Sequence, residues 1–135
     1  MEDFTPEQIS VIANAYCSMA RALNQFQVMR WPEFLYEQQL DLNAYQTSLL
    51  NRAHDLQTMA ARPAFQNPAA MTSAIQQAMS NAESSLTHIR NLSVALNIGA
   101  VMVALAAYVA RANLRGIETA LRELSELVKV EDQEP

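Results

Sequence analysis

The amino-acid sequence predicts an all-α protein, and three features support this fold class. Half of the 135 residues are hydrophobic but only 7% are aromatic, so the apolar mass is mostly Ala, Leu, Val and Met, which suit helices. The chain has only two glycines, whereas a β-sandwich or barrel needs many turns. Long stretches repeat apolar residues at three- and four-residue spacing. At this length we expect one domain, residues 1–135.

The first helix is predicted over residues 6–30. Thr5 is a good N-cap, Pro6 suits the first helical position, and Gln8 completes a capping box. The apolar positions that follow are close to a heptad pattern, which indicates a helix with one buried side. These positions are Ile9, Ile12, Tyr16, Met19, Leu23 and Phe26.

A second helix is predicted over residues 32–62. Trp31 precedes Pro32, and a residue before proline is pushed out of the helical region, whereas proline itself starts helices well. The apolar residues of this helix are Leu35, Leu42, Tyr45, Leu49, Leu56 and Met59. The sequence ARPAFQNPAA follows as a loop, in which Asn67 and Pro68 form a second N-cap pattern.

Two topologies fit the rest of the chain. Apolar residues keep a strict three- and four-residue alternation across residues 75–128, which favours one helix over residues 68–129 in an elongated hairpin or coiled coil. Alternatively, segments of similar length suit an up-down four-helix bundle, in which the chain turns near Asn97–Gly99. The sequence leaves both topologies open.

The segment 92–110 contains no charged residue and is the longest apolar run in the chain. Its length, between Arg90 and Arg111, is close to that of a membrane-spanning helix. However, it contains Ser93 and Asn97, six of its nineteen residues are Ala, and the apolar stripe continues beyond it unchanged. We therefore expect something to cover its outer face: other helices of this chain, another protein chain, or lipid.

This covered face leads to a predicted interaction surface. Its residues are Leu96, Ala100, Val103, Ala104, Ala107 and Tyr108 in the apolar segment, with Trp31 at the first break. Trp31 is interpreted either as an exposed anchor or as a plug at the end of the bundle. The chain also has eleven Gln and nine Asn residues, and such amide-rich surfaces suit packing against another helix, including a second copy.

No residue pattern predicts a catalytic, cofactor-binding or metal site. A glycine-rich phosphate loop and zinc-ligand spacing are both absent. The acidic residues that recur at four-residue spacing after Trp31 are interpreted as a solvated stripe, and the single cysteine as a small buried apolar residue. The residues considered are His54, His88, Cys17, Glu33, Glu37 and Asp41.

The net charge of −5 disfavours a nucleic-acid-binding protein, which would normally show a basic face. The acidic start MEDF does not resemble a secretory signal, and the compartment stays open. The acidic tail, residues 130–135, is expected to fray.

The sequence thus predicts a non-enzymatic helical protein that acts through helix–helix association, with itself or with a helical partner. One alternative is membrane association through residues 92–110. The other is a small enzyme that uses His54 or His88.

Overall fold

The computed structural model describes residues 1–58 and 63–133, and this part of the chain contains five α-helices. A 3-10 turn, η1 (Trp31–Glu33), follows the first helix, and two short strands pair with each other, β1 (Glu2–Asp3) and β2 (Ala64–Phe65). The helices are α1 (Pro6–Met29), α2 (Tyr36–Thr58), α3 (Pro68–Leu86), α4 (Leu92–Ala110) and α5 (Leu114–Gln133). The predicted all-α class is confirmed.

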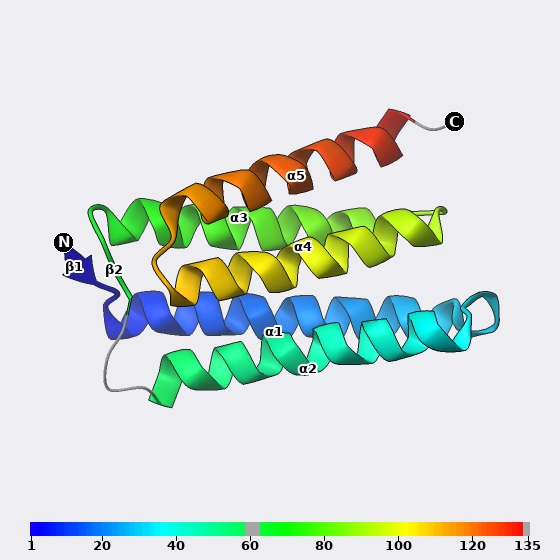
Figure 1. Cartoon of the computed structure of the whole chain (residues 1–135), viewed down its shortest axis with the longest axis horizontal. Helices are drawn as coiled ribbons and strands as arrows, with labels where there is room; N and C mark the ends of the chain where they lie inside the picture. Colours follow the sequence, from blue (N-terminus) through cyan, green and yellow to red (C-terminus); the bar gives the residue numbers. More distant parts are fainter. Residues whose placement is uncertain (59–62, 134–135) are drawn as a thin grey trace.

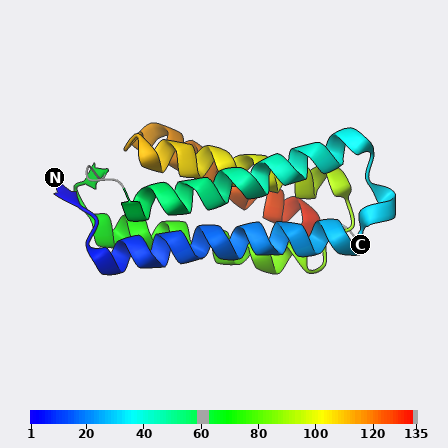
Figure 2. The ribbon, with the colours of Figure 1, turned by 90° about the horizontal axis from the view of Figure 1, so that it is seen from below.

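Successive helices run in opposite directions along one long axis (Figure 1). Helix α1 packs between α2 and α3, α4 packs between α2 and α5, and α5 also contacts α3, so the helices surround a shared core (Figures 1 and 2). Helices α1 and α3 consequently lie side by side and point the same way. The largest fully buried side chains are Tyr16, Ile12, Met19, Leu23, Leu42, Leu49, Ile75, Met79, Ile98, Met102, Leu105 and Ile117.

The structure corrects both expected topologies. The continuous helix expected over residues 68–129 is divided into α3, α4 and α5, and Asn97–Gly99 is not a turn but lies inside α4. The chain reverses direction between α3 and α4 and again between α4 and α5, on either side of the turn expected at Asn97–Gly99. Asn91 caps α4 by accepting a 2.9 Å hydrogen bond from the Ser93 backbone N–H, and Asn113 does the same for the N–H of Gly116 at 3.0 Å.

Helix α4 ends in a Schellman motif whose left-handed residue is an alanine. The Asn113 N–H donates to the Tyr108 carbonyl at 2.9 Å, and the Ala112 N–H donates to the Val109 carbonyl at 3.1 Å. Ala112 has a φ of 52°, a conformation that glycine usually occupies in this motif. The absence of glycine here explains why the sequence did not indicate the reversal.

The buried side of α4 also differs from the predicted stripe. The residues of α4 that belong to the predicted three- and four-residue alternation are half-buried or exposed. The loops on both sides of α4 break the alternation, so it does not mark the same side in successive helices. Helix α4 is apolar on nearly every side, so its apolar periodicity carries little information about which side is inside. Its buried residues are Val94, Ala95, Ile98, Gly99, Met102, Leu105, Ala106 and Val109.

The predictions for the first two helices are largely confirmed. The Thr5 hydroxyl accepts from the Gln8 N–H at 3.1 Å, the Gln8 side chain accepts from the Thr5 N–H at 2.9 Å, and every predicted apolar position of α1 is buried. Helix α2 begins at Tyr36 rather than at residue 32, because η1 and Phe34 occupy the turn. Leu35, which was expected among the apolar residues of this helix, therefore precedes it and is exposed. Its predicted end at residue 62 lies outside the described residues.

The ends of the chain show two further differences from expectation. Helix α5 extends to Gln133, so most of the expected tail, residues 130–135, is helical. At the other end, β1 pairs with β2 in antiparallel register, and the rings of Phe4 and Phe65 lie 5.2 Å apart. This pairing joins the N-terminus to the connection between α2 and α3.

Candidate helix-binding face

Helices α1 and α3 are almost free of charge. Of the 24 residues of α1 and the 19 of α3, only Glu7, Arg21 and Glu83 are charged, whereas α5 contains eight charged residues in 20. Ser, Asn, Gln and Ala occupy most exposed positions of α1 and α3 instead. Depletion of charge is typical of the centre of protein–protein interfaces rather than of free surface.

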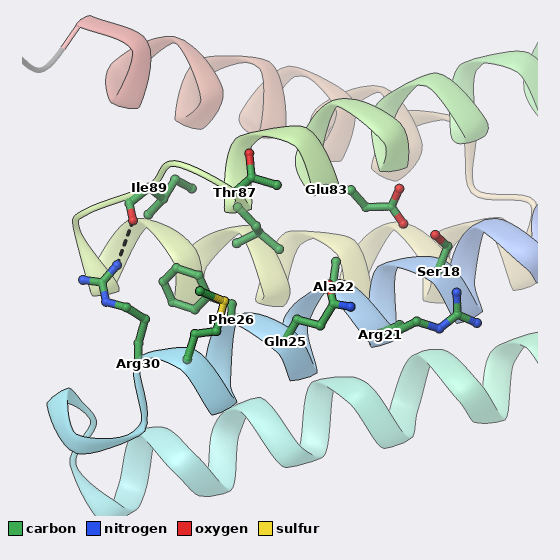
Figure 3. A pocket seen from close by; sticks show the side chains of 11 residues that line it. Ser18, Arg21, Ala22, Gln25, Phe26, Arg30, Glu83, Thr87 and Ile89 are labelled. Atoms are coloured by element: carbon green, nitrogen blue, oxygen red, sulfur yellow. Dashed lines mark hydrogen bonds between the residues drawn. The ribbon is translucent and has the colours of Figure 1, made fainter.

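Two grooves run between α1 and α3. The first has a volume of about 640 Å³, and its apolar lining consists of Ala22, Phe26, Met29, Leu86 and Ile89 (Figure 3). The second has a volume of about 540 Å³, and its lining includes Val11, Asn14, Ala15, Ser73, Gln76 and Ser80. Ser18 and Glu83 line both grooves and so lie where the grooves meet. We call the surface of α1 and α3 that contains both grooves the α1–α3 face.

Glu83 is the one acidic residue in the grooves. Its Oε1 atom is buried and has no hydrogen-bond partner among the described residues. Ser18 extends toward it from α1, and Arg21 lies alongside in the first groove (Figure 3), but Arg21 forms no ion pair with it. A partly buried carboxylate without a donor is unfavourable, so a positive charge placed over the groove would be favourable here.

A cluster of exposed apolar side chains lies where α1 turns into α2, next to the first groove. Most of the large hydrophobic residues that are exposed in the described part of the chain fall within this one short segment. Exposed apolar side chains that are scattered singly are normal, whereas several that lie close together often mark an interaction site. We call this cluster the apolar end; its residues are Val28, Met29, Trp31, Leu35, Tyr36 and Leu40.

The turn beneath the apolar end is held by Arg30 and Phe34. Phe34 is buried and packs edge-on against Phe26 at 5.9 Å, so Phe34, and not Trp31, plugs the bundle. Trp31 is 54% exposed. The Arg30 guanidinium pairs with Glu33 and donates to the carbonyls of Ile89 (2.9 Å) and Arg90 (3.0 Å), which joins this turn to the α3–α4 loop (Figure 3). The hydrogen bond from Arg30 lowers the pKa of Glu33.

A buried amide network fixes the register of α1 against α2. The Gln27 side-chain amide donates to Gln39 Oε1 at 2.6 Å and to Asn43 Oδ1 at 3.0 Å, and its oxygen accepts from Gln46 Nε2 at 2.7 Å. Gln39 in turn donates to the Trp31 carbonyl at 3.2 Å. Because one residue of slip would leave these buried groups unpaired, the network ties α2 and the backbone at Trp31 to α1.

The structure separates the predicted interaction residues into two groups. Leu96, Ala100, Val103, Ala104, Ala107 and Tyr108 are half-buried on α4, which has α2 on one side and α5 on the other. Trp31 is exposed at the apolar end instead. The predicted interaction residues do not include the α1–α3 face, although the scarcity of charge in residues 6–29 and 68–86 is a signal for it.

Helix α4 makes close contacts at both glycines of the chain: Gly99 lies in α4 and faces α2, and Gly116 lies in α5 and faces α4. A Cβ atom on Gly99 would lie 2.8 Å from the Tyr45 ring, and a Cβ atom on Gly116 would lie 2.4 Å from the Tyr108 ring. Part of the apolar helix is therefore covered by α2 and α5 at distances that only glycine permits. Even so, α4 is the one helix of the described residues that is long and apolar enough to cross a membrane, by length and composition.

The residues considered for chemistry do not converge. His54 is exposed on α2, and His88 is exposed in the α3–α4 loop at the opposite end of the bundle (Figure 1). Glu33 belongs to η1 while Glu37 and Asp41 belong to α2, and within the described residues no group of three His, Cys, Asp or Glu side chains is placed to hold a metal ion. Cys17 is partly buried against the core.

No family model, curated protein or solved structure matches this chain.

Proposed function

We propose that this protein is a non-enzymatic assembly protein that binds helices through the α1–α3 face and the adjoining apolar end. The observation that carries the proposal is the near absence of charge on two adjacent helices whose shared surface is grooved. A grooved surface with few charges accepts the ridges of another helix with little desolvation of ionised side chains.

The fixed geometry of this region supports the proposal. The ion pair and carbonyl hydrogen bonds of Arg30 and the amide network of Gln27 hold the backbone beneath the apolar end, while the side chains of this end stay exposed. A surface that is ordered before binding loses less conformational entropy when a partner docks. Exposed Trp, Tyr and Met side chains are also enriched at interfaces.

Site-specific photocrosslinking in cells that produce the protein tests the proposal. The photoreactive residue p-benzoyl-phenylalanine would replace Gln25, which is exposed and lines the first groove, or Glu118, which is exposed on α5, as a control. We expect an adduct of one discrete mass from position 25 and none from position 118. Equal adducts from both positions, or none from either, would contradict the proposal.

A matched pair of leucines tests the contribution of the apolar end. Leu40 and Leu50 lie on the same helix and are both 49% exposed, but only Leu40 belongs to the apolar end. We expect Leu40→Lys to reduce the yield of the position-25 adduct severalfold and Leu50→Lys to leave it unchanged. Identical yields for the two variants would remove the apolar end from the binding surface.

A membrane-associated role for α4 is the second candidate. The most apolar stretch of 18 residues in α4 has a mean hydropathy of 2.1, and 44% of this stretch is buried within the fold. Flotation with phosphatidylcholine–phosphatidylglycerol vesicles, without detergent, tests this candidate. Lipid-bound wild-type protein, with loss of binding in Val103→Asp, would favour it, whereas protein that stays entirely in the dense fraction would eliminate it.

A further inference from the structure

We infer that the partner bound by the α1–α3 face is a second copy of this chain, and that the two copies pair with their helices parallel. This inference rests on the proposed function and names its partner. Its basis is the position of two oppositely charged residues that line the first groove, Arg21 on α1 and Glu83 on α3. The third charged residue of this groove, Arg30, is already paired with Glu33.

These two residues make the face complementary to itself. Arg21 and Glu83 lie at the same level along the bundle, on adjacent helices that run in the same direction (Figures 1 and 3). If a two-fold axis lies between two such faces and parallel to the helices, α1 of one copy covers α3 of the other. Arg21 of each copy then meets Glu83 of its partner, and two reciprocal ion pairs form.

The unpaired oxygen of Glu83 supports this pairing. Its Oε1 atom lacks a hydrogen-bond partner among the described residues, while Arg21 of the same chain lines the groove without pairing to it. Because Glu83 as a whole is half-buried in the groove, an arginine that approaches from above offsets the charge of this carboxylate. An antiparallel arrangement would instead place α1 against α1 and α3 against α3, and neither charged residue would meet its opposite.

The size of the face suits a stable dimer. Helix α3 has 19 residues, so the two helices offer a strip about 28 Å long and about 20 Å wide. This strip is on the order of 600 Å², and a standard interface buries about 800 Å² on each partner. In the parallel arrangement the two apolar ends lie at the same end of the dimer, where Met29 and its neighbours add to the buried surface.

Charge reversal tests the inference, with mass measured by sedimentation velocity and multi-angle light scattering. We expect wild-type protein to approach twice the mass of the chain as its concentration rises. Arg21→Glu and Glu83→Arg should each raise the dimer dissociation constant about tenfold or more, because each variant places two like-charged pairs in the interface. Glu118→Arg on α5 is the matched control and should not change it.

Mixing the two variants separates pairing between chains from pairing within one chain. In an equimolar mixture, the Arg21→Glu chain carries two acidic groups and the Glu83→Arg chain two basic groups, so a heterodimer restores both ion pairs. The double variant R21E/E83R should also dimerise. A pair formed only within one chain would not be restored by mixing. Circular dichroism of each variant checks that it remains folded.

The outcomes are distinct for the inference and for the proposed function. Wild-type protein that stays monomeric at every concentration, or a variant mixture that does not associate, would overturn the inference. If the position-25 photocrosslink nevertheless joins a different protein, the proposed function survives. A position-25 adduct with twice the mass of the chain, together with rescue on mixing, supports both.

Discussion

Replacing Gln27 with leucine tests the amide network between α1 and α2. Gln27 is 2% exposed and Gln39 is 8% exposed, so removal of the Gln27 side-chain amide strands the Gln39 oxygen that now accepts at 2.6 Å. Asn43 is exposed and Gln46 half-buried, so both can turn to water. A buried polar group left unpaired costs about 1–3 kcal/mol, and we expect Gln27→Leu to lower the free energy of unfolding by about 2 kcal/mol.

Urea denaturation followed by far-ultraviolet circular dichroism measures this change. At a fixed protein concentration, the midpoint should fall while the slope of the transition stays constant. Gln57→Leu is the control, because Gln57 is exposed on α2 and lies outside both grooves of the α1–α3 face. The control should change stability by less than about 0.5 kcal/mol.

A double-mutant cycle completes the test of the network. Gln27→Leu together with Gln39→Leu removes both stranded groups and should be more stable than the sum of the two single variants predicts. Recovery should be incomplete, because the Trp31 carbonyl then loses its 3.2 Å hydrogen bond from Gln39. Strictly additive losses, or a Gln27→Leu loss no larger than that of Gln57→Leu, would refute the reasoning.

Three further substitutions test packing and backbone strain. The Tyr16 hydroxyl is buried without a hydrogen-bond partner among the described residues, and burial raises its pKa, an effect that Arg52 partly offsets. Tyr16→Phe should therefore stabilise the fold by about 1 kcal/mol. The stability of the wild-type protein should fall above a pH of about 10, because the tyrosine of the unfolded chain ionises first. Denaturation at pH 8 and pH 11 should show a smaller fall for the variant. Gly116→Ala should lower stability by about 1–3 kcal/mol because its Cβ would lie 2.4 Å from the Tyr108 ring, and an unchanged thermal midpoint would contradict this contact. Ala112→Gly should raise stability by about 1 kcal/mol because Ala112 has a φ of 52°, and a decrease in the urea midpoint would contradict that assignment of strain.

The parts of the fold that were predicted correctly depend on interactions between neighbouring residues. The capping box of Thr5 and Gln8 spans three residues, and the buried positions of α1 follow a helical period, so both can be read along the chain. The same holds for Asn67, which accepts from the Ala70 N–H at 3.0 Å. These features do not depend on which helix lies alongside.

The errors arose where local patterns had more than one interpretation. Asn91 and Asn113 are the caps that begin α4 and α5, but the chain has nine asparagines, and most of them do not start a helix. Ala112 adopts the conformation usually given to glycine, so the second reversal lacked its ordinary signal. Gly99 suggested a turn, whereas it serves close packing against Tyr45 inside α4.

The sequence by itself determined that this protein is helical, where its first helix begins, and which side of that helix is buried, because capping and helical periodicity act over three or four residues. Only the tertiary structure decided the buried side of α4, since a helix that is apolar all round can bury any side. It also decided the candidate binding face. Sparse charge in α1 and α3 becomes one surface, with Arg21 and Glu83 in the same groove, only after two distant segments pack side by side.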